Sequence, residues 1–359
     1  MLNFFGEFFC HGKLTKGLNS TFIALIPKVE SPQRVADFHP ISLVSSVYKI
    51  LSKVLDNRLR IVVGNVVSAS QSAFIKGRQI LDGILIANEL VDDAKKNKKE
   101  LLMFKVDFEK AYDSVDWGYL DEVMGKMNFP PLWRSWSVSR RQQHQCWLMG
   151  ARLMSLGLRE VSDKGDPLSP FLFLLAAEGL KVMMSALVAN GLFTPYAVGA
   201  QVMMEVSHLQ FADDTLLIGV ISWANVRALK AVLLLFESIS GLKVNFHKSM
   251  LFGVGVAVSW LHEVASVMNC KHGHLPFLYL GFPIGGDPRR LQFWYPLVEK
   301  IRSGMTSWKC KNLSLGGRLI LLKSVLSSIP VYFLSFFKAP SGIISTLDSL
   351  FTNFFILFA

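Results

Sequence analysis

Short apolar segments that end at aspartates constrain the fold of this 359-residue chain most strongly. Leu101–Phe108 is an apolar run with one lysine, short enough to be a buried strand, and Asp107 stands near its end. Val206–Phe211 and Thr215–Val220 are two further apolar runs, and Ala212–Asp214 separates them in the pattern of a β-hairpin. The sequence therefore predicts buried strands with aspartates at their ends.

Helical segments are interleaved with these strands. Apolar residues at helical spacing predict helices over Leu43–Val63, Ile80–Ala94, Pro167–Ala189 and Val226–Ser238, and Asn19–Pro27 reads as a short strand. The basic run Lys95–Glu100 is interpreted as a solvated turn. Because strands and helices mix without regular alternation, we expect an α+β fold rather than a doubly wound sheet.

The charge balance narrows the class of partner. The chain has 38 Lys and Arg against 27 Asp and Glu, a formal charge of +11. This excess fits nucleic acid or an anionic membrane surface, and also an ordinary basic protein. A membrane-spanning helix needs about 20 apolar residues in a row, whereas Phe171–Ala177 ends at Glu178. We therefore predict no transmembrane helix, and Met1–Cys10 lacks the basic start of a secretory signal.

Cysteine spacing argues against a disulfide framework and a zinc ribbon, because the four cysteines form no CxxC pair. We therefore expect the protein in a reducing intracellular compartment. Cys270, His272 and His274, with His262 upstream, leave a metal site open. Their spacing matches none of the usual zinc patterns, so a loop of polar and small residues is the preferred interpretation.

The aspartates offer a specific chemistry if the strands are neighbours. Alone, Asp213 and Asp214 fit a structural turn, since aspartate tolerates turn geometry. Their apolar flanks place them in a core, where two acids repel each other and need cations. Asp107 would then converge with them into an oxygen site suited to Mg²⁺. Two such ions about 3.5–4 Å apart can activate a 3′-hydroxyl and stabilise leaving pyrophosphate, which is nucleotidyl transfer.

Three segments in order resemble the catalytic motifs of LINE-type reverse transcriptases. Lys105–Trp117 resembles motif A, Gly165–Pro170 motif B and Phe211–Asp214 motif C. Further segments that resemble the fingers, the region after motif C, the primer grip and the plant-element thumb side are Leu25–Lys28, Asp37–Leu43, Gln71–Arg78, Gly241–Asn245 with Lys248–Ser249, Tyr279–Pro283, Gly316–Arg318 and Ser324–Leu326.

The resemblance implies a right-hand polymerase fold of the α+β class. Residues 1–285 would form fingers and palm, and residues 286–359 a truncated, thumb-like region. The implied function is an RNA-directed DNA polymerase of a non-LTR retrotransposon, with Mg²⁺ or Mn²⁺ as cofactor. An RNA template, a DNA primer and deoxynucleoside triphosphates would be its partners, bound largely without sequence preference. We expect it inside the cell, at nuclear DNA, with no membrane association.

The resemblance also assigns roles to individual residues. Asp107, Asp213 and Asp214 would be the catalytic acids and metal ligands. Tyr112 would be the aromatic gate that excludes a 2′-hydroxyl. The remaining implied nucleotide-binding residues are Phe108, Lys164, Gly165, Lys28, Arg78 and Lys248. The implied primer grip is Tyr279, Leu280 and Gly281.

Three departures from the family pattern support an alternative. Lys164 stands where the family has glutamine, and His39 where it has arginine. A lysine cannot reproduce the paired donor and acceptor of an amide. Val138–Lys164 fits the family poorly. The alternative is a catalytically inactive, nucleic-acid-binding remnant. In either case we expect a piece of a longer open reading frame that also encodes an endonuclease.

Overall fold

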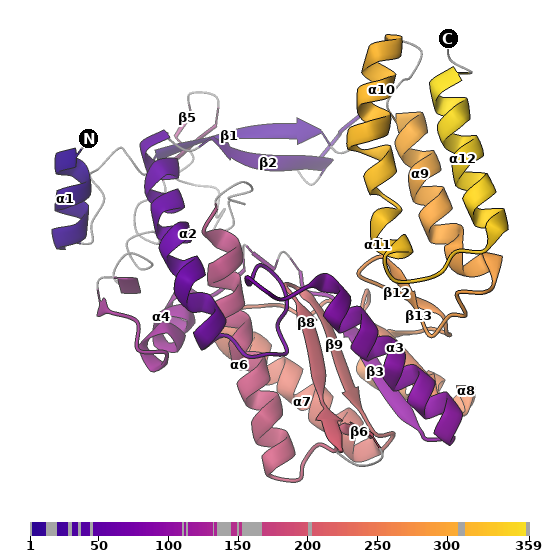
Figure 1. The fold of residues 1–359 in the computed structure, drawn as a ribbon. Coiled ribbons are helices and arrows are strands. Elements are labelled where there is room, and N and C mark those ends of the chain that lie inside the picture. Colours follow the sequence, from indigo (N-terminus) through magenta and orange to yellow (C-terminus); the bar gives the residue numbers. More distant parts are fainter. Residues whose placement is uncertain are drawn as a thin grey trace. The chain divides into compact units, whose positions relative to one another are not determined.

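The computed structural model describes residues 2–11, 20–27, 31–34, 37–43, 46–109, 111–112, 114–131, 133–134, 145–148, 151–152, 167–199, 203–307 and 313–356. Contacts divide the chain into two units (Figure 1). The first comprises residues 1–83 and 93–272, and the second comprises residues 84–92 and 273–359. The predicted palm–thumb boundary at residue 285 falls inside the second unit.

The first unit holds most of the sheet structure. Its helices are α1 (Leu2–His11), α2 (Ser46–Val66), α4 (Trp117–Lys126), α6 (Ser169–Ala189), α7 (Trp223–Ser240) and α8 (Val258–Met268). Its strands are β1 (Ser20–Pro27), β2 (Phe38–Leu43), β3 (Leu101–Val106), β4 (Gln145–Leu148), β5 (Ala151–Arg152), β6 (Tyr196–Val198), β7 (Met204–Val206), β8 (His208–Phe211), β9 (Asp214–Gly219), β10 (Met250–Val254) and β11 (Lys271–His272). Helix α3 (Ile80–Asn97) has residues in both units.

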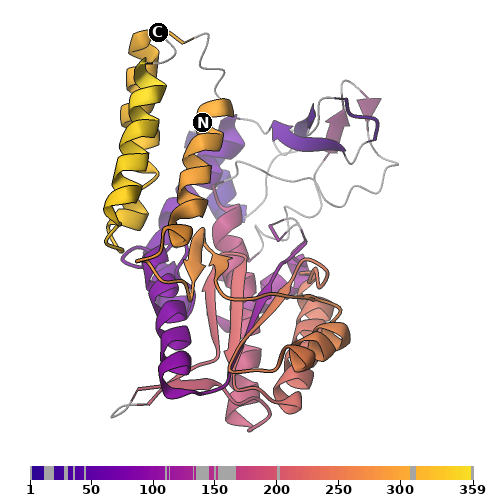
Figure 2. The ribbon, with the colours of Figure 1, turned by 90° about the vertical axis from the view of Figure 1, so that its right-hand side faces the viewer.

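Five strands form the central sheet, in the order β11-β10-β3-β9-β8. Figure 1 labels its strands β3, β8 and β9, and Figure 2 shows the same unit from the side. Strand β3 pairs antiparallel with both β9 and β10, so it is the middle strand. Alternate residues of β3, Leu102, Phe104 and Val106, enter one core with buried residues of α4, α6 and α7. Strand alternation thus directs these three side chains to the same face of the sheet. A second sheet has the order β2-β1-β4-β5.

Most predicted elements are confirmed, and so is the α+β class. The predicted hairpin is β8–β9, and the four predicted helices are α2, α3, α6 and α7. Two predictions were wrong. Lys95 and Lys96, predicted as part of a solvated turn, lie in the last turn of α3. The helix continues to Asn97 and is capped by Lys98 in the left-handed conformation, where the Ala94 carbonyl accepts a backbone hydrogen bond. Cys270–His274 is no simple loop, since Lys271 and His272 pair with β10 as β11.

Helix α6 differs from the expectation that Glu178 ends its apolar segment. Among the described residues it is the one helix long and apolar enough to cross a membrane. Glu178 does not interrupt it, because this carboxyl is buried and accepts hydrogen bonds from the Ser68 amide and hydroxyl, each at 3.1 Å. More than half of its apolar window (56%) is buried in the structure, and α6 contacts α4 and α7. A core helix accounts for these features.

The second unit is mainly helical. Its elements are β12 (Phe277–Tyr279), β13 (Phe282–Ile284), the 3₁₀ turns Leu291–Trp294 and Leu326–Ser328, α9 (Tyr295–Ser307), α10 (Leu315–Ser324), α11 (Val331–Leu334) and α12 (Ser341–Ile356). Phe282 stacks on Phe333 with ring centroids 4.2 Å apart, and Phe293 meets Phe337 edge to face at 4.8 Å. These aromatic pairs join the β12–β13 hairpin to the helices.

Candidate active site

The three predicted acids lie at the same end of two paired strands. Strand β3 ends at Val106, which is opposite Thr215 of β9. Asp107 therefore follows β3 at the end where Asp214 begins β9. Asp213 occupies the turn between β8 and β9, next to the closing pair Phe211–Asp214. The structure thus brings together the residues that the sequence singled out.

The turn that carries Asp213 has an unusual backbone. Ala212 has φ of +54°, in the left-handed region that costs a residue with a β-carbon roughly 1–2 kcal/mol. The Gln71 side chain, only 1% exposed, holds this residue: its Oε1 accepts from the Ala212 amide at 2.8 Å, and its Nε2 donates to the Ala212 carbonyl at 3.4 Å. The sequence placed Gln71 in a segment that resembles the fingers but predicted no role for its side chain.

The backbone of Asp107 is held from the opposite side. Its amide donates to the buried hydroxyl of Ser249 at 3.0 Å, and its carbonyl accepts from the Asn245 amide at 2.8 Å. The Ser249 hydroxyl in turn donates to the Asn245 carbonyl at 2.8 Å. Both acid-bearing positions are therefore fixed by polar groups from distant segments. Ser249 is a second residue whose role the sequence did not reveal.

The electrostatics of the site are those of crowded carboxylates. Burial raises the pKa of the Asp214 carboxyl, and the negative charges of Asp213 and Asp107 raise it further, while the Lys105 ammonium opposes the shift. The three acids are thus close enough to interact. Lys105 was not predicted as a site residue, although it lies two residues before Asp107 and so shares its side of the strand.

Tyr112 lies directly against these acids. Its hydroxyl donates to Asp213 Oδ1 at 3.2 Å, and its ring lies 5.0 Å from that of Phe173 on α6. Burial and the adjacent Asp213 charge raise the pKa of the Tyr112 hydroxyl, so it stays protonated as a donor. An exposed aromatic ring beside a predicted catalytic acid is where the predicted gate against a 2′-hydroxyl would stand.

The donor set fits a hard divalent cation. Asp107, Asp213 and Asp214 supply only carboxylate oxygens, which Mg²⁺ prefers, and Asp214 feels the charge of the other two. Within the described part of the chain, no three Asp, Glu, His or Cys side chains are already gathered closely enough to hold a metal. Metal binding would therefore need the carboxylates to draw together.

Two other predicted nucleotide-binding residues have mainly internal contacts. Phe108 pairs with Val244 through its backbone, and its ring lies 6.4 Å from that of Phe236 in the core. The half-buried Arg78 guanidinium donates to the carbonyl oxygens of Ser68, Gln71, Gly64 and Val67. These contacts favour a structural role for Arg78 over the predicted phosphate contact.

The remaining predicted residues divide by location. Lys248 is exposed and immediately precedes Ser249, which contacts Asp107. Tyr279, Leu280 and Gly281 lie in the second unit, where Leu280 and Gly281 form the two-residue turn between β12 and β13 with φ of +52° and +85°. Lys28, Lys164, Gly165 and the side chain of His39 lie outside the described residues.

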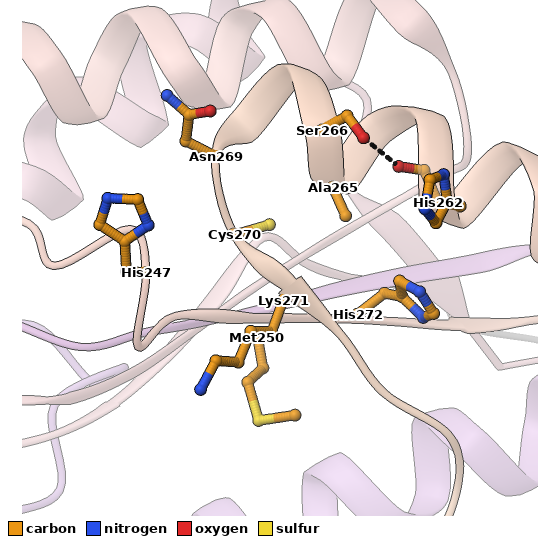
Figure 3. A pocket seen from close by; sticks show the side chains of 9 residues that line it. All are labelled: His247, Met250, His262, Ala265, Ser266, Asn269, Cys270, Lys271 and His272. Atoms are coloured by element: carbon orange, nitrogen blue, oxygen red, sulfur yellow. Dashed lines mark hydrogen bonds between the residues drawn. The ribbon is translucent and has the colours of Figure 1, made fainter.

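A separate pocket of about 580 Å³ is lined by two of the three histidines considered for a metal site, His262 and His272, and by Cys270, but not by His274 (Figure 3). The rings of His262 and His272 are 5.7 Å apart, and His247 stands apart from both. Burial raises the pKa of the nearby Cys270 thiol to about 11, so the thiolate that binds metals is disfavoured.

Comparison with known proteins identifies the class of this site. Residues 26–284 match the family model described as reverse transcriptase (RNA-dependent DNA polymerase). The match covers more than half of the chain, so the chain belongs to the reverse transcriptase family. The predicted right-hand polymerase fold is that of this family.

The curated relatives are proteins of transposable elements. The chain is 25% identical over 334 residues to an uncharacterised 149 kDa protein of transposon TX1 from Xenopus laevis, covering 90% of this chain and 24% of that protein. It is 25% identical over 210 residues to a Pol polyprotein of the type-1 retrotransposable element R2 from Nasonia vitripennis, covering 58% and 19%. The predicted LINE type is thereby confirmed. The chain spans about a quarter or less of these relatives.

Two further similarities differ widely in the share of this chain that they cover. A putative ribonuclease H protein of Arabidopsis thaliana is 43% identical over 58 residues, which is 16% of this chain and 9% of that protein. Among solved structures, telomerase from Candida tropicalis in complex with a fragment of telomeric RNA aligns with a TM-score of 0.49 at 12% identity, covering 98% of this chain and 56% of that one.

Proposed function

We propose that this chain is the polymerase part of a LINE-type retrotransposon protein and extends a DNA primer on an RNA template. The observation that carries the proposal is the placement of Asp107 beside Asp213 and Asp214 at one end of β3 and β9. Membership of the reverse transcriptase family supports it. Deoxynucleoside triphosphates would be the substrates, and nuclear DNA the place of action.

Reverse transcriptases generally use divalent metal ions, and we propose Mg²⁺, or Mn²⁺ in its place, for this chain. When bound, the ions activate the primer 3′-hydroxyl and neutralise the leaving pyrophosphate. Asp107, Asp213 and Asp214 would hold them. Tyr112 would exclude ribonucleotides by the bulk of its ring. Lys248 is exposed and lies next to Ser249, which holds the Asp107 backbone, so its ammonium would attract the triphosphate.

The test is primer extension by the purified chain on an RNA template with Mg²⁺ or Mn²⁺. Extension is expected, and Asp213→Ala should reduce it by at least about a thousandfold, since the reaction depends on carboxylate-held charge. Binding of the RNA–DNA duplex should survive in the variant and weaken with salt. The matched control is Asp287→Ala, an acid exposed in the second unit.

A catalytically inactive remnant would give a different result. It would bind the duplex with the same salt dependence but extend no primer with either metal. Lys164→Gln restores the family residue and is expected to raise extension if the chain is an enzyme. An unchanged or lower rate would show that Lys164 is not a defect.

A further inference from the structure

We propose that Gln71 is a positioning residue for the catalytic carboxylates: its buried amide fixes the left-handed backbone of Ala212 and so sets the direction of Asp213 and Asp214. This inference rests on the proposed polymerase function. The observation behind it is that the Gln71 side chain, in the segment after α2, bonds both the amide and the carbonyl of Ala212 in the β8–β9 turn.

The first step is the need for a clamp at Ala212. Positive φ is usually left to glycine or asparagine, and of the two turn residues only Ala212 adopts it. Such a conformation persists only where the surroundings over-determine it. Gln71 Oε1 is 2.8 Å from the Ala212 nitrogen. Because Gln71 is almost fully buried, water does not compete for its hydrogen bonds.

The second step is that Gln71 itself is rigid. Its Oε1 also accepts from the Ala73 amide at 3.1 Å. The flanking residues pair in parallel with β8: the Gln210 amide donates to the Ser70 carbonyl at 2.9 Å, and the Ser72 amide to the Gln210 carbonyl at 3.0 Å. The backbone on both sides of Gln71 is therefore hydrogen-bonded to β8, the strand that leads into the Ala212 turn.

The third step is that this segment is anchored on its far side. Arg78 donates to the carbonyls of Ser68 and Gln71, and Glu178 of α6 accepts from the amide and hydroxyl of Ser68. Charged groups thus fix the residues before Gln71. A continuous series of hydrogen bonds connects α6 to the catalytic turn, and Gln71 is its last member.

The consequence concerns metal binding. Carboxylates that share an ion must be held within about 0.5 Å of their working positions. Asp213 and Asp214 directly follow Ala212, so a rotation of that peptide changes the direction of both side chains. Gln71 touches neither substrate nor metal in this assignment and acts only through the turn.

The test uses Gln71→Met in the full chain, which keeps the side-chain size and removes both polar contacts. The Mn²⁺ concentration for half-saturation, measured by electron paramagnetic resonance, should rise at least fivefold. The Ala212 amide should exchange with deuterium at least tenfold faster, while the Ile218 amide, bonded to the Ser207 carbonyl at 2.8 Å, keeps its protection. Unchanged values for Mn²⁺ binding and Ala212 exchange would overturn the proposal.

Two further variants separate positioning from general loss of a buried polar group. Gln210→Met removes another buried glutamine of the same hairpin, whose amide bonds Thr215 rather than Ala212. It should change Mn²⁺ half-saturation less than twofold. The double variant Gln71→Met with Ala212→Gly should recover at least half of the lost affinity, because glycine adopts positive φ without a clamp. No recovery would indicate that Gln71 acts in some other way.

The same measurements keep this inference distinct from the proposed function. If the unsubstituted chain binds Mn²⁺ through Asp213 but extends no primer, the polymerase proposal fails and the positioning result stands. If the unsubstituted chain extends primers and Gln71→Met leaves Mn²⁺ half-saturation, Ala212 exchange and the Mg²⁺ requirement for extension unchanged, the positioning role fails alone. Should Gln71→Met not fold, Gln71→Glu, which keeps the acceptor for the Ala212 amide and loses only the Nε2 donor, is expected to retain Ala212 protection.

Discussion

The Tyr112 hydroxyl donates a hydrogen bond to Oδ1 of Asp213 at 3.2 Å. The gate predicted from the sequence and the acid predicted as a metal ligand are therefore in direct contact. Because the ring also packs on Phe173, these contacts fix the position of an aromatic side chain immediately beside a predicted metal ligand.

This arrangement predicts that the Tyr112 ring, and not its hydroxyl, excludes ribonucleotides. Tyr112→Val should lower the preference for dTTP over UTP by about tenfold to a hundredfold, as expected for a lost steric contact. Tyr112→Phe should stay within about threefold of the unsubstituted chain on the same reasoning. The measurement is kcat/KM for each nucleotide in primer extension. Equal discrimination in all three proteins would remove Tyr112 from this role.

Arg78 is predicted to contribute to stability more than to substrate binding. Arg78→Met should lower the free energy of unfolding by about 2–3 kcal/mol, because buried carbonyl oxygens lose a charged donor. Arg227→Met, at an exposed position of α7, should change it by less than about 0.5 kcal/mol. Urea titration measures both. A raised KM for nucleotide with unchanged stability would instead support the phosphate contact.

Gly241 is predicted to tolerate no side chain. It ends α7 with φ of +75°, and a β-carbon there would meet the Ser114 carbonyl at 2.5 Å. Gly241→Ala should cost about 2–3 kcal/mol, since conformational strain and a steric clash add. Gly191→Ala has a similar φ of +68° with open space around it and should cost only about 1 kcal/mol. Thermal or urea unfolding compares them; equal costs would contradict the clash.

His208 is predicted to make stability depend on pH. Burial lowers the pKa of this imidazole to about 4. Below pH 6.5 the unfolded chain therefore binds a proton at His208 that the folded state does not bind. The free energy of unfolding is highest above pH 6.5 and falls as the pH drops towards 4. The loss is about 3 kcal/mol for a shift of this size. Urea titrations of the unsubstituted chain and His208→Phe should diverge over this window. Parallel curves would show that His208 does not titrate on unfolding.

The sequence was sufficient for elements whose signals are local. The β8–β9 hairpin combines two apolar runs with a turn, and α6 and α7 show continuous helical patterns, so each could be placed without its neighbours. The short pairings could not. Strand β1 pairs in parallel with β4, and β10 with the two-residue β11, where few residues carry any pattern and the partner lies far along the chain.

The site divides in the same way. Asp107, Asp213 and Asp214 were found because they stand in segments that resemble the family's catalytic motifs in the family's order, whereas the adjacent aspartates alone fit a structural turn. Gln71 and Ser249 were missed because their partners are 141 and 142 residues away, and a polar residue in a loop carries no sign of such a contact. The resemblance of ordered motifs identified the acids, while tertiary structure alone identified the residues that hold them.

The parallel pairing of Ser70 and Ser72 with Gln210 has a consequence for how the chain matures. During synthesis the N-terminal partner leaves the ribosome long before β8 exists, so the catalytic turn is completed late and across a large loop, which is slow to close. A 5′-truncated gene copy that begins after Ser72 would still encode all three acids. Its product would lack Ser70 and Ser72, which pair with Gln210, and Gln71, which holds Ala212. An intact motif in a shortened insertion therefore does not imply an assembled active centre.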